Sequence, residues 1–212
     1  AIAGAFNGFL ITRLRVTPIL ATLGSGQIFT GIALVLTGGP AIVGFPAAWD
    51  WIGNGKLFGL AVPFVLFVLI ALAMAFLLAR TTFGVSLQLI GTNPKAAVFA
   101  GLDRAKMVFL SYVLTGTLAS IAGIMLSGRT NAAKSDYGTS YLLQAILIAV
   151  LGGTNPAGGK GTVAGVSIAV VALMLLSSGF QILRFSNHLI DFIWGAFLLL
   201  VIAINAYKNR TR

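Results

Sequence analysis

The chain has 212 residues, of which 58% are hydrophobic and 8% charged, and its mean hydropathy is +1.00. An ordinary globular domain carries about 25% charged residues, so this composition excludes a soluble domain and indicates a membrane protein. The net charge is +10, and the basic residues that give it lie between apolar runs. We therefore attribute the charge to membrane orientation and expect no nucleic-acid partner. No cysteine and one histidine leave no basis for a metal site or for catalytic residues.

Apolar segments long enough to cross a bilayer recur along the chain. A crossing helix needs about 20 residues, and the candidates in chain order are residues 17–36, 57–79, 107–126, 162–178 and 189–207. Residues 1–11 are short and lack a signal-peptide pattern, so we expect the end of a longer helix in an N-terminally truncated chain. The sequence predicts an all-α fold: a single transmembrane permease domain over residues 1–212, a polytopic helical bundle with about six to seven membrane segments.

Residues 141–151 are too short to cross a bilayer without help from their flanks, so this segment either crosses or re-enters. If it crosses, ten of the Lys and Arg residues lie on the cytoplasmic side and four outside. If it re-enters, the division is seven to seven. The positive-inside rule favours crossing and a cytoplasmic C-terminus.

The glycine-rich stretch at residues 149–162 has two interpretations. A phosphate-binding loop would need glycine at 154 and a hydroxyl residue at 161, where the chain has Thr154 and Gly161. We therefore expect a tight turn between membrane helices, with a G-x-x-x-G packing face at its end. The turn and packing residues are Gly152, Gly153, Gly158, Gly159, Gly161 and Gly165.

The stretch "VLGGTNPAGGKGTVAG" resembles the signature region of permease subunits of ribose/xylose-type monosaccharide ABC importers. Residues 17–39 and 80–106 are similar to further segments of that family, in the same order, and only its N-terminal helices lack a counterpart. The chain departs from the family pattern at Tyr141–Gln144, where an acidic pair is usual, and at Trp194, where a basic residue is common. These departures concern the solute more than the class of transporter.

The resemblance implies a permease that imports a monosaccharide across the bacterial inner membrane and is not itself an enzyme. It implies no cofactor on this chain, because ATP and Mg would bind a separate cytoplasmic ATPase subunit. The other implied partners are a second permease copy, giving a homo- or heterodimer, a periplasmic or lipid-anchored sugar-binding protein, and the lipid bilayer. Branched-chain amino-acid permeases share some of this patterning, so a non-sugar solute stays an alternative.

Residues 80–106 are expected to form the cytoplasmic ATPase-coupling loop. Asn93 and Pro94 are typical of a helix start and Gly101 of a helix end. The short helix between them is marginal alone in water, and its small and apolar residues, Ala97 among them, would supply a docking surface. The coupling residues are predicted to be Gly91, Asn93, Pro94, Ala96, Ala97, Gly101 and Asp103.

Two interpretations of polar residues stay open. Gln27, Thr30 and Gln144 are the polar side chains that could meet a solute along its path. His188 and Asp191 could form a proton relay, which would make the chain a proton-coupled secondary transporter. The favoured interpretation places Asp191 near the start of the last helix and His188 at the membrane interface.

Overall fold

The computed structural model describes residues 1–155 and 158–210, without the side chains of residues 140, 187, 188, 191 and 204–210. The helices are α1 (Ile2–Thr12), α2 (Pro18–Thr37), α3 (Ala47–Asn54), α4 (Val62–Arg80), α5 (Thr82–Thr92), α6 (Pro94–Phe99), α7 (Arg104–Thr130), the 3-10 helix η1 (Thr139–Tyr141), α8 (Leu142–Leu151), α9 (Val163–Ile182) and α10 (Asn187–Arg210). The strands are β1 (Ile42–Val43), β2 (Lys56–Leu57), β3 (Leu60–Ala61) and β4 (Ala132–Ala133).

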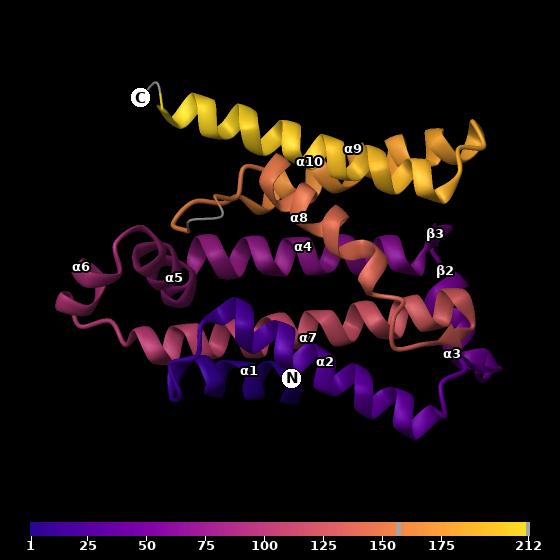
Figure 1. Ribbon diagram of the computed structural model, residues 1–212, viewed down its shortest axis with the longest axis horizontal. Helices are drawn as coiled ribbons and strands as arrows, with labels where there is room; N and C mark the ends of the chain where they lie inside the picture. Colours follow the sequence, from indigo (N-terminus) through magenta and orange to yellow (C-terminus); the bar gives the residue numbers. More distant parts are fainter. Residues whose placement is uncertain (156–157, 211–212) are drawn as a thin grey trace.

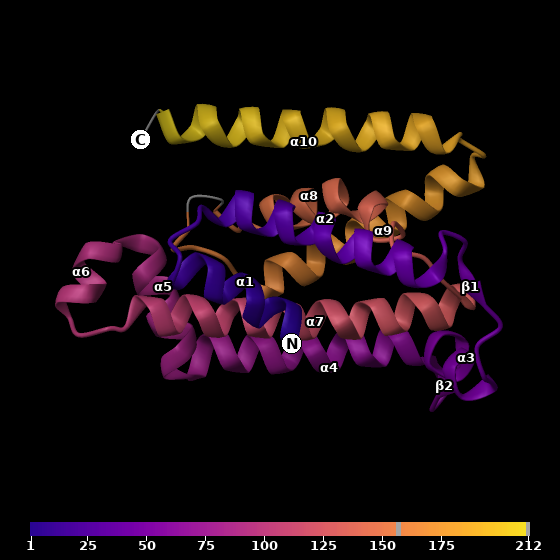
Figure 2. The ribbon, with the colours of Figure 1, turned by 60° about the horizontal axis from the view of Figure 1, so that its bottom comes forward.

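The long helices α4, α7, α9 and α10 run along a common axis; α7 and α9 run toward the end that holds the short strands, and α4 and α10 run the opposite way (Figure 1). One end holds α5, α6, the connection from α8 to α9 and the C-terminal end of α10. We call it the α6 end. The opposite end, which we call the hairpin end, holds α3 and the short strands (Figures 1 and 2). The helical bundle that the sequence predicts is confirmed.

Two small antiparallel ladders at the hairpin end were not predicted. Ile42 pairs with Ala133 in the first, and Lys56 pairs with Ala61 in the second. Phe58 and Gly59 form the tip of the second ladder with φ of 52° and 83°. The predicted span over 57–79 was therefore wrong at its start, because residues 57–61 turn back on themselves and α4 begins only at Val62.

Four helices in the described part of the chain are long and apolar enough to cross a membrane: α2, α4, α7 and α9. This is fewer than the six to seven segments expected. Helices α1 and α8 and residues 192–203 are apolar but shorter. At about 1.5 Å per residue, the ten residues of α8 rise only about half the thickness of a bilayer core.

The segment around α8 nevertheless connects the two ends of the molecule. The chain leaves β4 at the hairpin end, passes through η1, and reaches the α6 end after α8 (Figure 1). The structure thus favours the crossing interpretation, with the flanking residues supplying the missing length. Leu147 of α8 is fully buried against Leu173 of α9 and Trp194 of α10, and these contacts hold the short helix in place.

The long helices present apolar side chains to the outside of the molecule. At most 11% of the residues in the apolar stretch of each candidate span are buried. A protein that exposed this many large apolar side chains would aggregate in water, whereas lipid tails solvate such side chains. The structure is thus that of a membrane-embedded bundle.

Glycines bring several helices into backbone contact. A Cβ on Gly116 of α7 would lie 2.8 Å from the Cα of Gly4 of α1, and Gly8 of α1 meets Phe109 of α7 in the same way. Gly53 of α3 touches the backbone of α7 at Gly128. Small residues allow such close approach in membranes, where packing replaces the hydrophobic effect as the main attraction between helices.

Candidate functional site

The segment from α4 to α7 reverses direction at the α6 end through capped turns. The Thr81 hydroxyl accepts a hydrogen bond from the Gly84 N–H at 3.4 Å, and Gly84 lies directly against the backbone of Leu78. The Asp103 carboxylate accepts from the Lys106 N–H at 3.0 Å and so caps α7. Both side chains satisfy backbone donors that a helix start leaves unpaired.

Helix α6 has the start and end that the sequence predicts. The Asn93 Oδ1 accepts from the Ala96 N–H at 3.1 Å, and Pro94 is the first helical residue. Gly101 follows the last turn with φ of +83°. Its N–H donates to the Val98 carbonyl at 3.0 Å, and the Leu102 N–H donates to the Ala97 carbonyl at 3.1 Å. These two hydrogen bonds form a Schellman motif at the end of the helix. Local hydrogen bonds therefore define both ends of α6.

The exposed face of α6 is apolar, and it contains Ala96, Val98 and Phe99, three of the four small and apolar residues expected to contact a partner. Phe99 is 92% exposed and Val98 is 53% exposed. Ala97 is only 5% exposed, because α6 packs this side against α5 and α7. The prediction that Ala97 offers a surface to a partner is therefore corrected: Ala97 holds α6 onto its own chain. Ala96 is exposed beside Phe99 and Val98.

The end of α5 contacts the glycine turn that follows α8. A Cβ on Gly91 would lie 2.5 Å from the Gly159 nitrogen and 3.0 Å from the Gly159 Cα. A Cβ on Gly159 would lie 2.9 Å from the Cα of Thr92. The two segments carrying the predicted coupling and turn residues thus meet backbone to backbone, which their separation in sequence did not reveal. Neither segment has room for a side chain at this contact.

The glycines of the turn divide into two kinds. Gly153, Gly158 and Gly159 have φ of +84°, +98° and +80°, as predicted for left-handed turn positions. Gly152 has φ of −69°, so its predicted left-handed role is wrong. A Cβ on Gly152 would instead lie 2.6 Å from the Cα of Val166, which makes it a close-packing residue. Pro156 lies outside the described residues.

The predicted G-x-x-x-G face is half right. Gly165 of α9 lies directly against the Gly152 carbonyl of α8. Gly161 precedes α9 and faces the Thr154 side chain, at 3.2 Å from its Oγ1 to a Cβ on Gly161, so it packs within the turn. The close contact between α8 and α9 is therefore made at Gly152 and Gly165.

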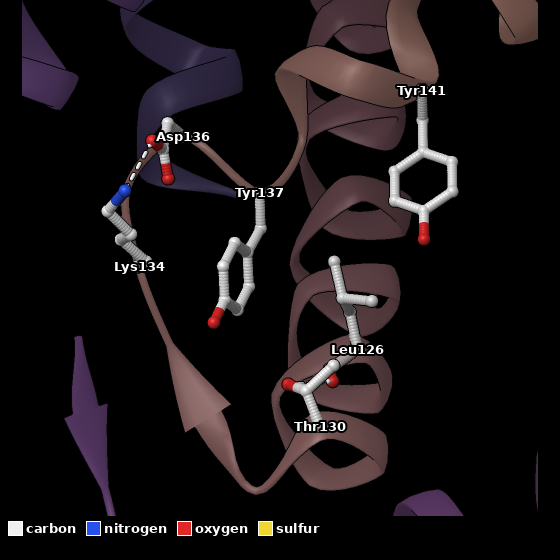
Figure 3. Close-up of a pocket in the computed structure, with 6 residues that line it drawn as sticks. All are labelled: Leu126, Thr130, Lys134, Asp136, Tyr137 and Tyr141. Atoms are coloured by element: carbon white, nitrogen blue, oxygen red, sulfur yellow. Dashed lines mark hydrogen bonds and ion pairs between the residues drawn. The ribbon is translucent and has the colours of Figure 1, made fainter. Parts of the chain in front are cut away.

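The hairpin end contains two adjoining cavities that the sequence did not predict. The smaller, of about 340 Å³, is lined by Leu126, Thr130, Lys134, Asp136, Tyr137 and Tyr141 (Figure 3). The larger, of about 770 Å³, shares four of these residues and extends between α4, α7 and α9 among mainly apolar side chains. The only sequence signal was a short polar connector with two tyrosines between apolar segments.

Polar groups gather at the mouth of these cavities. Lys134 Nζ and Asp136 Oδ2 form an ion pair at 2.7 Å, and both side chains are exposed. The hydrogen bond from Lys134 lowers the pKa of Asp136, and the same bond raises the pKa of Lys134. Tyr137 and Tyr141 extend along α7 on either side of Leu126 in the view of Figure 3, and neither phenol hydroxyl has a hydrogen-bond partner within the described chain.

The residues predicted for a solute path lie on two helices, away from the lining of the hairpin-end cavities. Gln27 and Thr30 lie on α2 and Gln144 on α8, and none of them lines either of these cavities. The proposed pair of His188 and Asp191 belongs to α10, but these side chains lie outside the described residues.

The fold and the site define a polytopic helical membrane protein with an exposed apolar helix at one end and cavities at the other. The chain belongs to the family described as "Branched-chain amino acid transport system / permease component", whose model matches residues 1–202. The predicted resemblance to ABC importer permeases is thereby confirmed at the level of the family.

Known relatives are named as import permeases. The chain is 38% identical over 208 residues to the autoinducer 2 import system permease protein LsrD of Yersinia pseudotuberculosis, covering 95% of this chain and 62% of that protein. The same-named protein of Yersinia enterocolitica is 38% identical (95% and 63%), and that of Yersinia pestis 37% (95% and 62%). The chain thus spans about three fifths of the length of these relatives. No solved structure gives a significant match.

Proposed function

We propose that this chain is a permease subunit of an ATP-driven importer in the bacterial inner membrane, with the α6 end and the C-terminus in the cytoplasm. Its partners are cytoplasmic ATPase subunits, which bind the ATP and Mg, a second permease copy, and a sugar-binding protein on the outer side. The solute is a monosaccharide or a related small polyhydroxylated molecule. Family membership and the relatives named for import support this assignment.

The observation that carries the proposal is the exposed apolar face of α6. Phe99 is almost fully exposed on a six-residue helix whose two ends are fixed by capping hydrogen bonds. Such a helix presents a rigid apolar anchor to the groove of a partner. Since the α6 end lies beyond the long apolar helices (Figure 1), lipid does not explain the exposure.

The contact between Gly91 and Gly159 supplies a route for coupling. When the ATPases close on ATP, they displace α6, and α5 moves with it because the two helices are packed together. The turn at 158–159 is displaced in turn, and α8 and α9 follow because they are joined to it and to each other at Gly152 and Gly165. Two packings of these helices, one open to each side, give alternating access.

The distribution of basic residues supports the orientation. Helices α1 and α4 end at the α6 end, α7 begins there, and α6 and the glycine turn also lie there. Among the described segments, this end therefore carries Arg13, Arg80, Lys95, Arg104 and Lys160, among others. The hairpin end carries Lys56, Arg129, Lys134 and Arg184. The more basic end is expected to face the cytoplasm.

Docking is tested with the pair Phe99→Asp and Phe58→Asp in the complete transporter. Both phenylalanines are more than 90% exposed, but Phe58 lies at the hairpin end. Burying an unpaired carboxylate in an apolar groove is strongly unfavourable, so Phe99→Asp should remove the ATPase during purification while Phe58→Asp retains it. Normal ATPase retention by Phe99→Asp would overturn the docking assignment.

Orientation and energy source are tested separately. The chain contains no cysteine, so Lys160→Cys and Lys56→Cys can be labelled without background. Lys160→Cys should react only with reagent that reaches the cytoplasm, and Lys56→Cys should react from outside. Uptake that survives ATP depletion and is lost in Asp191→Asn would instead support the proton-coupled alternative.

The solute is tested by uptake competition in cells that express the complete transporter. Monosaccharides should compete for uptake, whereas branched-chain amino acids, which the family description names, should not. Competition by the amino acids alone would replace the sugar assignment and leave the importer assignment intact.

A further inference from the structure

A third cavity, of about 790 Å³, lies at the α6 end between the α1–α2 connection and the first turns of α7. It is separate from the cavities of the hairpin end, and none of the predicted coupling or turn residues lines it. Its polar lining residues come from two segments about ninety residues apart in sequence: Thr12, Arg15, Thr17, Arg104, Ser111 and Tyr112.

The cavity is lined by two guanidinium groups and by no carboxylate. Arg15 comes from the connection after α1, and Arg104 is the first residue of α7. The nearest acid in sequence, Asp103, already accepts a hydrogen bond from the Lys106 N–H. Neither arginine forms an ion pair within the described part of the chain. Both arginines are exposed at the end of the long helices, and together they give the cavity a positive lining that attracts anions.

Arg15 lies in a sharply turned connection between α1 and α2. Arg15 has φ of +54°, which is uncommon for a residue with a side chain. The Val16 N–H donates back to the Leu10 carbonyl at 3.2 Å, and Pro18 starts α2 immediately afterwards. The start of α2 has no side-chain cap, so its first N–H groups and its helix dipole add to the positive potential at the cavity.

The remaining lining groups distinguish donors from acceptors. The Thr12 and Ser111 hydroxyls donate to the carbonyls of Gly8 and Val108, each at 2.7 Å, so their protons are committed. The Thr17 and Tyr112 hydroxyls have no hydrogen-bond partner within the described chain and are available as donors. Ile11, Val16 and Val108 supply apolar walls beside these groups.

We propose that this cavity binds the phosphate group of an anionic phospholipid, with Arg15 and Arg104 as its two charged contacts. The planar guanidinium matches phosphate geometry with paired hydrogen bonds. The apolar walls and the position at the end of the long helices suit the boundary between headgroups and acyl chains. Basic pockets between membrane helices bind lipid headgroups by this chemistry, whereas free phosphate would gain nothing from the apolar walls.

The test uses the complete transporter in nanodiscs of phosphatidylcholine with or without phosphatidylglycerol, and native mass spectrometry to count retained lipids. The double variant Arg15→Gln/Arg104→Gln should retain phosphatidylglycerol at least about tenfold more weakly than the matched control Arg13→Gln/Arg80→Gln, because it loses hydrogen bonds to a charged phosphate, each worth roughly tenfold or more. The control removes the same charge from the same end without touching the cavity, so both variants lose the general attraction of basic residues to an anionic surface equally. The variant Arg15→Lys/Arg104→Lys keeps the charge but not the paired geometry of the guanidinium, so its retention should lie between those of the glutamine variant and wild type.

Two results would overturn the proposal. Equal retention of phosphatidylglycerol by the glutamine double variant and its control would show that the cavity is not a lipid site. Thermal stabilisation by inorganic phosphate in pure phosphatidylcholine discs, equal to that by phosphatidylglycerol and lost in the glutamine variant, would assign the site to soluble phosphate. If the glutamine variant fails to fold, the lysine variant still decides, because it should retain phosphatidylglycerol more weakly than Arg13→Lys/Arg80→Lys, and equal retention by these two lysine variants would overturn the proposal.

Discussion

The two ends of the molecule are built by different means. At the α6 end, backbone meets backbone at Gly91 and Gly159, and every reversal of the chain between α4 and α7 is closed by a capping hydrogen bond. At the hairpin end, two-residue ladders and exposed side chains surround two cavities. The backbone contact at the α6 end has no free space to take up a displacement, which suits the coupling that we propose. The hairpin end encloses free space next to its connectors.

The largest effect should come from filling the contact between α5 and the glycine turn. Gly91→Ala places a Cβ 2.5 Å from the Gly159 nitrogen, and a backbone atom cannot rotate away. Overpacking costs about 1–3 kcal/mol, so we expect a lower melting temperature in detergent and a loss of ATP-dependent uptake. The measurement is a thermal unfolding curve together with an uptake assay.

The matched control for this change is Gly26→Ala on α2. Gly26 is also helical, but a Cβ there would have open space around it. Replacing a helical glycine by alanine gains about 0.5–1 kcal/mol, so Gly26→Ala should be neutral or slightly stabilising. Equal melting temperatures and equal uptake for Gly91→Ala and Gly26→Ala would show that the contact at Gly91 contributes neither to stability nor to transport.

A second large effect should separate Gly165 from Gly161. Gly165→Leu forces α9 away from the Gly152 carbonyl of α8, whereas Gly161→Leu meets only the Thr154 side chain, which can rotate. We expect Gly165→Leu to reduce the yield of folded protein severely and Gly161→Leu mildly, by size-exclusion chromatography of detergent extracts. Equally severe losses from both variants would restore the G-x-x-x-G interpretation in its original form.

A more local effect is expected at the end of α6. Gly101→Val places a β-branched residue at φ of +83°, which costs about 1–2 kcal/mol or more, while the space around it is open. The long helices should therefore stay folded, and ATPase retention should fall because α6 loses its defined end. A variant with unchanged retention would mean that the partner does not require the ordered helix.

The smallest effect belongs to the hairpin end. Because the pKa of Asp136 is lowered by Lys134, the pair stabilises the fold above the ordinary pKa of an aspartate, and this contribution disappears as the pH falls through the lowered pKa. The raised pKa of Lys134 keeps the pair charged up to alkaline pH. Asp136→Asn should lower the melting temperature slightly at pH 7 and leave it unchanged once the pH is below the lowered pKa of Asp136.

Asp50→Asn is the control for this measurement, because Asp50 is an acid of the same end that bonds Asn54 and forms no ion pair among the described residues. At pH 7, Asp50→Asn should leave the melting temperature closer to that of wild type than Asp136→Asn does. A difference between Asp136→Asn and wild type that persists in acid, after Asp136 is protonated, would contradict the ion-pair account.

The features that the sequence predicted well are local ones. Asn93, Pro94 and Gly101 determine the ends of α6 through hydrogen bonds within a few residues, so their types and spacing were sufficient. The apolar runs likewise predicted α2, α4, α7 and α9 because lipid imposes composition and length.

The features that the sequence missed depend on tertiary contacts. Nothing in the pattern around Ala97 distinguishes a side facing α5 and α7 from a side facing a partner. Gly161 and Gly165 have the same spacing signal, but only the position of α8 shows which one touches a helix. The cavities at the hairpin end arise from connectors, whose paths hydropathy does not predict.

The most direct test of the central claim is site-specific cross-linking of α6 to the ATPase. Phe99→Cys and Phe58→Cys would each be introduced into the cysteine-free chain, and the complete transporter would be treated with a short thiol-to-amine cross-linker. The account predicts a permease–ATPase product from Phe99→Cys and none from Phe58→Cys. A transporter that stays active with Phe99→Cys but yields no such product, or yields it from Phe58→Cys, would contradict it.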